Sequence, residues 1–298
     1  MRSLLIAMLL AGCADEPAPV PEGPHYRYVM SELKIPVNNN DARAYGLDLN
    51  NDGVLDNQLG MVFGTLSSLG LGVDGTAREA MLRGGINLLV DLQTVDFGSA
   101  DVSGVTTYLG SNPSPAPCLD PADLSTCGQQ LKGTAHFSIE PDSFSDVGVA
   151  SVEDSVLLAD VNRLPVKLAL DVTAPLRVDL HGARVKLTGL SETGFRAVIA
   201  GAIKIADVDR VMIPQAATEM NRIVTTECGQ PSGVAPCGCL GRSRLLQKQF
   251  DKNLDCAISV DEVRKDDLVT ALLAPDVTID GEKQLSFGVG IELVRATF

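Results

Sequence analysis

The stretch "KQLSFGVGIELVRATF" (residues 283–298) decides the fold, because apolar side chains alternate with other residues along it. Successive side chains of an extended strand point to opposite faces, so every second residue shares a face. Such alternation is typical of an antiparallel sheet with one buried face. The stretch therefore predicts a strand of such a sheet. Its buried positions would be Leu285, Phe287, Val289, Ile291 and Leu293.

The same period of two recurs in earlier segments of the chain. In the first of them, Ile86, Leu88, Val90 and Leu92 alternate with polar residues. Alternation over many segments predicts a curved antiparallel sheet. The pattern leaves open whether this sheet stays open or closes into a barrel. The alternating segments are residues 86–97, 166–170, 176–187 and 195–205.

A period of 3.6 residues predicts helices between these strands. Residues 59–70 place apolar side chains on one helical face, and residues 76–83 form a second, shorter pattern that ends at Gly84 and Gly85. A further helix is opened by Pro214, which is favoured in the first helical turn. That helix would bury Ala217, Met220 and Val224.

Together these patterns predict an α+β fold in which helices partly cover a curved antiparallel sheet. Residues 25–298 are expected to form a single domain, since the chain is long enough for one large core. The cysteine-rich segment 228–273 is interpreted as an insertion, after which the last strand returns to the sheet.

Residues 1–12 have the features of a secretory signal peptide. Arg2 gives a positive start, an apolar run extends from Leu4 to Leu10, and small residues precede Cys13. The apolar run is too short to span a bilayer. The ending Leu10-Ala11-Gly12-Cys13 resembles the bacterial lipobox. This resemblance implies cleavage before Cys13 and acylation of its thiol and its new amino group.

Residues 13–24 predict a tether between that lipid and the body of the protein. Four prolines alternate there with small and acidic residues, a composition that favours an extended chain. Several acyl chains on one residue bind a membrane far longer than one chain does. We therefore expect a lipid-anchored protein of the cell envelope, at the outer membrane or on its periplasmic face.

The charge and composition exclude some partners. Asp and Glu number 38 against 24 Lys and Arg, which gives a net charge of −14 that repels nucleic acid. Trp is absent and aromatic residues make up only 4%, so surfaces for stacking sugars or bases are scarce. The partners that remain are the membrane, an envelope protein or an apolar ligand.

Six cysteines follow Cys13, and an oxidising compartment allows them to form disulfides. Cys118 and Cys127 flank a loop rich in Pro, Asp and Ser, so we expect them to pair. For the others the sequence cannot choose among the connectivities. We prefer Cys239–Cys256 with Cys228–Cys237. A zinc site is the alternative for these four, but they lack C-x-x-C spacing.

The "DLNNDGVLD" segment, residues 48–56, is the first acidic loop. Oxygen-bearing side chains alternate along it, and Gly53 supplies a sharp turn. Calcium takes six to eight oxygen ligands, so such side chains on a turning loop predict a calcium site. The pattern resembles the calcium loops of integrin-type and thrombospondin-type repeats. The predicted ligands are Asp48, Asn50, Asp52 and Asp56, the last closing the site.

The "DKNLDCAISVDE" segment, residues 251–262, is the second acidic loop and resembles an EF-hand loop. Its sixth position is Cys256, where that family has Gly, and a residue with a Cβ is strained in the left-handed turn needed there. We expect a disulfide from Cys256 to hold the turn. The resemblance implies calcium ligands at Asp251, Asn253, Asp255, Ala257 (through its carbonyl), Ser259 and Glu262.

Several functions fit these features. The sequence carries no G-x-S-x-G or H-E-x-x-H motif, so an enzyme is not expected. The lipobox, the acidic tether and "GLDLNNDGVLDNQLG" are similar to secreted lipoproteins of myxobacteria-like bacteria, a likeness that implies no particular activity. We predict a membrane-anchored, calcium-stabilised binding or scaffolding module. The alternatives are a carrier that holds an apolar ligand or lipid inside the curved sheet and, less favoured, a hydrolase that uses Asp or Glu.

Overall fold

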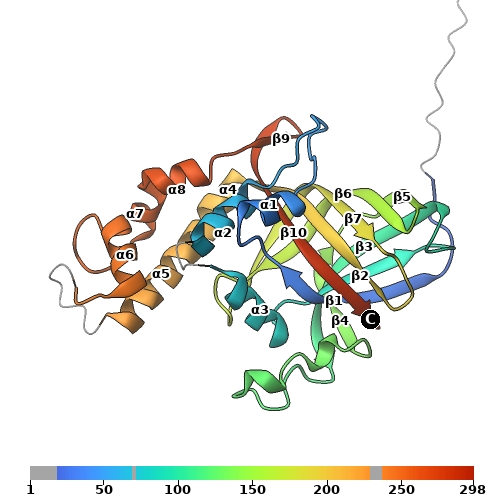
Figure 1. Cartoon of the computed structure of the whole chain (residues 1–298), viewed down its shortest axis with the longest axis horizontal. Coiled ribbons are helices and arrows are strands. Elements are labelled where there is room, and N and C mark those ends of the chain that lie inside the picture. The colour runs from blue at the N-terminus through green and yellow to red at the C-terminus, as the bar shows by residue number, and fades with distance from the viewer. Residues whose placement is uncertain (1–18, 69–71, 229–236) are drawn as a thin grey trace, which may run out of the picture.

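Figure 1 shows the computed structural model of the chain, which describes residues 19–68, 72–228 and 237–298. Eight antiparallel strands form a closed barrel. In ring order they are β1 (His25–Lys34), β2 (Leu88–Gln93), β3 (Ala100–Ser114), β5 (Gly148–Glu153), β6 (Val156–Leu168), β7 (Leu176–Thr188), β8 (Gly194–Lys204) and β10 (Glu282–Arg295). The predicted curved antiparallel sheet is confirmed, and it closes into a barrel.

The ring closes between strands that lie far apart in the sequence. Tyr28 of β1 faces Val90 of β2 on one side and Arg295 of β10 on the other. Two shorter strands lie off the ring: β4 (His136–Phe144) pairs with β3, and β9 (Val277–Ile279) pairs with β10. Full closure pairs the ring strands on both sides, so the ring has no free edge.

The α-helices lie in two long connections between strands. The helices predicted near residues 59–70, near residues 76–83 and at Pro214 are present as α2, α3 and α5. Within the described residues, no helix is long and apolar enough to cross a membrane. Between β1 and β2 lie α1 (Asn39–Ala44), α2 (Gln58–Ser68) and α3 (Asp74–Leu82). Between β8 and β9 lie α4 (Ile205–Asp207), the π-helical turn η3 (Val208–Met212), α5 (Ile213–Glu227), α6 (Gly241–Phe250), α7 (Val260–Lys265) and α8 (Asp267–Leu272).

Both connections leave and re-enter the barrel at the same end, because antiparallel neighbours reverse direction. Lys34, Leu88, Lys204 and Glu282 mark this end, which we call the helical end. α2, α3 and α5–α8 gather there, while the first residues of β1 and the last of β10 lie at the opposite, terminal end (Figure 1).

Inward-facing apolar side chains fill the barrel interior. All five predicted positions of the last strand, from Leu285 to Leu293, are buried. Phe287 meets Phe63 of α2 edge to face, with 5.9 Å between ring centroids, and Tyr28 meets Phe195 in the same way at 4.7 Å. Large buried side chains such as these each contribute about 1.5–3 kcal/mol to stability. The core therefore lies inside the barrel and continues under α2.

Residues 38–57 cross the outer wall of β10, where two glycines make room for them. Gly288 and Gly290 alternate with the inward-facing positions and so face outward. A Cβ at Gly288 would lie 2.1 Å from the carbonyl oxygen of Tyr45, and a Cβ at Gly290 would lie 2.6 Å from the Tyr45 ring. The close approach of this segment therefore depends on the absence of side chains at both positions.

The buried Asn57 fastens the same segment to the barrel. Its side-chain amide accepts a hydrogen bond from the Gly288 N–H at 2.8 Å and donates one to the Gly288 carbonyl at 3.0 Å. It also donates to the carbonyl of Ala42 at 2.9 Å. Leu47 and Leu49, which flank Asp48, are buried in the same outer cluster as alanines of β8. The first acidic loop is thus built onto the barrel wall.

Candidate functional site

The first acidic loop is organised by hydrogen bonds between its side chains and its own backbone. Asp48 accepts from the N–H of Asp52 at 3.2 Å and from the N–H of Gly53 at 2.9 Å. Asn50 Oδ1 accepts from the Asp52 N–H at 3.1 Å, and Asp52 Oδ1 accepts from the Val54 N–H at 2.8 Å. The Asn50 amide donates to Asp52 Oδ2 at 3.0 Å. Three of the predicted ligands therefore curl around one turn.

The second acidic loop repeats these bonds at equivalent positions. Asp251 accepts from the N–H of Asp255 at 3.1 Å and from the N–H of Cys256 at 3.0 Å. Asn253 Oδ1 accepts from the Asp255 N–H at 2.9 Å, and Asp255 Oδ1 accepts from the Ala257 N–H at 2.9 Å. The Asn253 amide donates to Asp255 Oδ2 at 3.0 Å. Two segments some two hundred residues apart therefore adopt the same arrangement.

Their backbones turn in the same way. The fourth position is left-handed in both loops, with φ of 61° at Asn51 and 61° at Leu254. The sixth position is also left-handed, with φ of 85° at Gly53 and 68° at Cys256. Only glycine enters this region without strain, so Cys256 holds the conformation at a cost. The expected strained turn at Cys256 is present.

Asp56, the predicted closing ligand of the first loop, is turned inward and buried. Its Oδ2 accepts a hydrogen bond from the Leu49 N–H at 2.8 Å. Burial raises the pKa of Asp56, and the nearby charges of Asp276, Asp52 and Asp48 raise it further, while the Leu49 bond lowers it. The net pKa lies above the ordinary value. A cation at this loop would therefore stabilise the ionised carboxylate.

Glu262, the predicted closing ligand of the second loop, reaches back to the start of that loop. Its Oε1 accepts from the N–H of Lys252 at 2.9 Å and from the N–H of Asn253 at 3.2 Å, while Oε2 accepts from Ser259. Ser259 and Glu262 form the capping box that begins α7. Partial burial raises the pKa of Glu262, but these bonds outweigh it and leave the pKa below its ordinary value.

Distant residues hold both loops in place. Arg184 of β7 donates to the carbonyl of Asp48 and, at 2.7 Å, to Asn51 Oδ1. Asn221 of α5 accepts from the Ile258 N–H at 2.8 Å and donates to the Ile258 carbonyl at 2.5 Å, as a neighbouring strand would. Sequence reasoning missed both supports, because no local pattern links a loop to a residue on another element.

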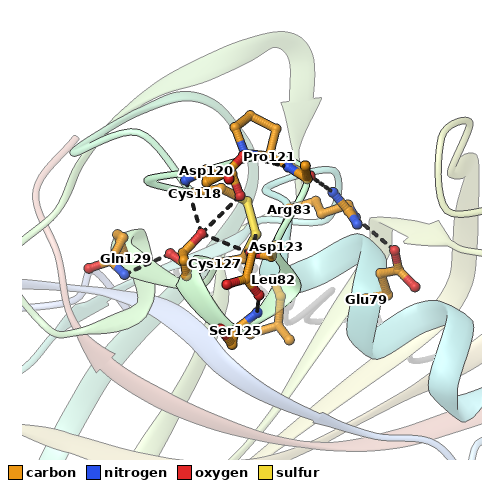
Figure 2. The surroundings of a disulfide bond; sticks show 12 residues. Glu79, Leu82, Arg83, Cys118, Asp120, Pro121, Asp123, Ser125, Cys127 and Gln129 are labelled. Atoms are coloured by element: carbon orange, nitrogen blue, oxygen red, sulfur yellow. Dashed lines mark hydrogen bonds and ion pairs between the residues drawn. A yellow bond between two sulfur atoms is a disulfide. The ribbon is translucent and has the colours of Figure 1, made fainter.

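The first pair of cysteines is joined as predicted. Cys118 and Cys127 form a disulfide that closes a loop beside the end of α3 (Figure 2). Asp123 caps the short turn inside this loop by accepting from the Ser125 N–H at 2.9 Å. Arg83 of α3 donates to the Pro121 carbonyl at 2.7 Å and pairs with Glu79 (Figure 2). The loop is therefore a rigid projection tied to α3.

The preferred pairing of the other four cysteines is wrong. Cys228 bonds to Cys239, and Cys237 bonds to Cys256. The chain turns sharply between the two middle cysteines, with left-handed φ at Cys237 and at Gly238. This turn places Cys239 beside the end of α5 and Cys237 beside the second acidic loop. The expected disulfide at Cys256 is present, although its partner is Cys237.

A metal at these sulfurs is not supported. Among the described residues, Cys237, Asp251 and Cys256 are the one group of three potential ligands whose atoms lie within 4.8 Å of one another. Since the two sulfurs are bonded to each other, the group offers a single ionisable ligand. All four cysteines of the zinc alternative are used in disulfides.

Cys13, the predicted lipidation site, lies outside the described residues. The acidic loops and the disulfides lie within them. The first described residues lead into β1 at the terminal end of the barrel, where Gly23 packs against Thr94 and Pro21 lies over Gly104.

Comparison of the chain with protein-family models, with curated proteins and with solved structures found no match.

Proposed function

We propose that this chain is a binding or scaffolding module of the cell envelope, anchored by a lipid on Cys13 and stabilised by calcium in its two acidic loops. The observation that carries the calcium proposal is the shared set of hydrogen bonds in the two loops. The same five bonds join equivalent positions in both loops, and they are made by the Asp, Asn and Asp that both loops carry at their first, third and fifth positions. The same oxygen-bearing side chains in the same geometry support a shared ligand.

Calcium suits the donors that these loops offer. It is a hard cation that accepts carboxylate, amide and carbonyl oxygens in flexible geometry. Asp48, Asn50, Asp52 and Asp56 would hold one ion. The EF-hand-like second loop would hold another through Asp251, Asn253, Asp255, the Ala257 carbonyl, Ser259 and Glu262. Side chains that now bond to backbone N–H groups would rotate toward the ion.

The position of each loop supports a structural role for the ion. The first loop lies on the barrel wall and leads directly into α2, while the second loop joins α6 to α7. The Cys237–Cys256 disulfide ties the second loop to the segment that precedes α6. An ion in either loop would cross-link side chains that otherwise repel one another. Calcium would therefore rigidify the helical end.

Residues 19–24, which follow the proposed anchor in the sequence, lead into β1 at the terminal end, opposite the helical end. β1 begins at the terminal end and rises about 3.3 Å per residue, so it carries the chain roughly 30 Å to the helical end. A lipid on Cys13 would hold the terminal end toward the membrane. The helices and the second acidic loop would then face away from it, where a partner can reach them.

A carrier that stores its ligand inside the sheet is less well supported. The apolar side chains of the barrel interior leave only a cavity of about 40 Å³ near the helical end. This space is far below the roughly 300 Å³ at which ligand pockets begin. The barrel itself therefore serves better as a rigid frame than as a container.

We expect the purified chain to bind two calcium ions. Native mass spectrometry in millimolar calcium should show both ions, and Asp52→Ala and Glu262→Gln should each remove one. Magnesium should substitute poorly, because it requires a tighter octahedron. Asp96→Ala is the control: Asp96 accepts from the N–H groups of Gly98 and Ser99 in a similar turn without further acidic neighbours. A wild-type chain without bound calcium would overturn the proposal.

The lipid anchor makes a separate prediction. Wild-type chain should fractionate with membranes and resist an alkaline wash, because several acyl chains hold it there. Cys13→Ser removes the acylated atom and should leave the chain soluble or unprocessed. Cys118→Ser with Cys127→Ser is the matched control, since it removes sulfur without touching the anchor. Retention of the Cys13→Ser variant in washed membranes would contradict the proposed anchor.

A further inference from the structure

Three neighbouring cavities lie between the helical end of the barrel and the helices that cover it. Their volumes are about 40, 130 and 170 Å³, from the barrel outward. Val73 and Leu170 line all three, and Leu66 and Met220 line the outer two. Since neighbouring cavities share lining side chains, they lie in a row from the barrel outward, and we call this row the elongated space.

The inner and middle parts of this space are apolar. Every described residue that lines the middle cavity is aliphatic, Met or Phe. At the innermost cavity the one charged lining residue is Lys167, whose ammonium is held by Glu140 at 2.5 Å and so is neutralised. Protein interiors contain few voids larger than a water molecule. Water gains no partners in such a lining, whereas apolar cavities of roughly 150 Å³ bind small hydrocarbons.

The outer cavity is different, because charged side chains gather at its rim. Arg222 makes two hydrogen bonds to Glu219, at 2.7 and 2.5 Å, and Arg242 pairs with Glu227. The side chain of Arg222 is 59% exposed, and that of Arg242 is 50% exposed. Among the described residues that line the outer cavity, Arg222, Arg242 and Glu219 carry charge, and Glu227 pairs with Arg242 from beside the cavity, so each arginine at the rim is paired with a glutamate.

We infer that the elongated space binds a single-chain amphiphile, with its acyl chain in the middle and outer cavities and a zwitterionic head group at the rim. A slender aliphatic chain matches the mainly aliphatic walls. A head group that carries both charges matches the paired Arg and Glu side chains. A simple fatty-acid anion would displace a glutamate from its arginine and would meet the net charge of −14. This site names a ligand for the proposed binding module, but it does not require calcium.

Ala216 offers a way to block the site. It lies on α5 and lines both larger cavities, at their junction. Ala216→Trp should fill the junction, and Ala216→Leu should fill it in part. Thr218→Trp is the matched control, since Thr218 is exposed two residues along the same helix. The wild-type chain has no Trp, so each Trp variant also carries a single fluorescent reporter.

The test uses the Cys13→Ser chain, purified without detergent, so that its own acyl groups cannot compete. Lysophosphatidylcholines with chains of six to fourteen carbons are titrated below their micelle concentrations by calorimetry, with calcium and with EDTA. Dodecanoate serves as the anionic probe of equal chain length. We expect one site per chain and an affinity that rises about four-fold per added methylene until the space is full. Dodecanoate should bind at least ten-fold more weakly than the matching lysophospholipid.

Ala216→Trp should lose at least ten-fold in affinity and Ala216→Leu less, while Thr218→Trp should match the parent chain. An unchanged or raised melting temperature would show that Ala216→Trp is folded. If Ala216→Trp does not fold, the affinity of Ala216→Leu tests the assigned site instead. Saturable binding that survives in Ala216→Leu and Ala216→Trp would overturn the assigned site. Tighter binding of dodecanoate would overturn the head group. If the chain binds lipid but takes up no calcium in millimolar calcium, the calcium proposal is overturned and this inference stands. If the chain binds calcium but no lipid, this inference is overturned and the calcium proposal stands.

Discussion

Replacing Gly288 with valine should lower the free energy of unfolding by about 3 kcal/mol, the upper range for overpacking a close contact. A Cβ at this position would lie 2.1 Å from the carbonyl oxygen of Tyr45, which is a backbone atom and cannot rotate away. The crossing segment would have to lift from the wall of β10. It would then lose the bonds between Asn57 and Gly288 and the burial of Leu47 and Leu49. Urea unfolding measures the effect.

Gly290 provides a contrast that separates a backbone collision from a side-chain collision. The atoms nearest to a Cβ at Gly290 belong to the Tyr45 ring, at 2.6 Å. Tyr45→Ala should therefore rescue much of the loss caused by Gly290→Ala. It should rescue little of the loss caused by Gly288→Ala, where the collision is with the backbone. A double-mutant cycle should show coupling of about 1 kcal/mol or more for the first pair and a smaller value for the second.

Gly75→Ala is the control for a general effect of replacing glycine. Gly75 lies in the first turn of α3, and a Cβ there would meet nothing within 4 Å. In a helix, alanine is favoured over glycine by roughly 0.5–1 kcal/mol, so this variant should keep or raise stability. A similar loss in Gly75→Ala and Gly288→Ala would show that the contact with Tyr45 is not what matters.

Alternation along the sequence predicted those barrel strands whose outward residues are mostly polar or small. β6 and β7 are buried mainly at every second position. β8 and β10 are also covered from outside over part of their length, but the outward residues there are mainly Ala, Gly and Ser, so their apolar residues still alternate. The burial predicted for five alternate positions of β10 was therefore correct. Alternation could not predict that the sheet closes into a barrel. Closure depends on pairing between β1 and β10, which lie at opposite ends of the sequence.

The strands that alternation missed carry large apolar residues on both faces or small polar residues on the inner face. In β1, Tyr28, Val29 and Met30 are buried in succession, because Val29 packs outward under the last residues of the chain. In β3 the fully buried Ser103 and Thr107 interrupt the apolar pattern. Ser103 is satisfied by a hydrogen bond to Thr94 at 2.8 Å, a residue on the connection between β2 and β3 that the alternation pattern does not reveal.

The acidic loops show what local sequence can and cannot predict about a site. The spacing of Asp and Asn correctly indicated two turning loops, because their hydrogen bonds join residues only two to five positions apart. The pairing predicted for the last four cysteines was wrong, since it depends on the turn at Cys237 and on where α5 ends. Arg184 was not predicted for the same reason: its loop partners lie over 130 residues away.

Saturating calcium should raise the free energy of unfolding by about 5 kcal/mol relative to EDTA. At roughly 100 times Kd, each independent site contributes about 2.7 kcal/mol by mass action, and two sites this far apart in the fold should add. Extracellular calcium modules typically bind at about 10⁻⁴–10⁻³ M, so tens of millimolar calcium approaches saturation. The melting temperature should rise on the order of 10 °C.

The electrostatics of the first loop explain why removing calcium should have so large an effect. Burial and the charges of Asp276, Asp52 and Asp48 raise the pKa of Asp56 above its unfolded value. A raised carboxylate pKa favours folding at low pH and opposes it once pH passes the folded pKa. At neutral pH the ionised Asp56 therefore costs stability unless a cation is bound. The benefit of calcium at the first loop should accordingly grow as pH rises through the raised pKa of Asp56, where this carboxyl group loses its proton.

Single substitutions should divide this stabilisation between the loops. Asp52→Ala removes a ligand of the first loop and should abolish about half of the calcium effect, and Glu262→Gln should abolish the other half. The double variant should melt at the same temperature in calcium and in EDTA. Asp96→Ala should keep the full wild-type increment, because Asp96 only caps a turn. A wild-type chain whose melting temperature is the same in calcium and EDTA would show that both loops are solvated turns, held by their own backbone hydrogen bonds alone.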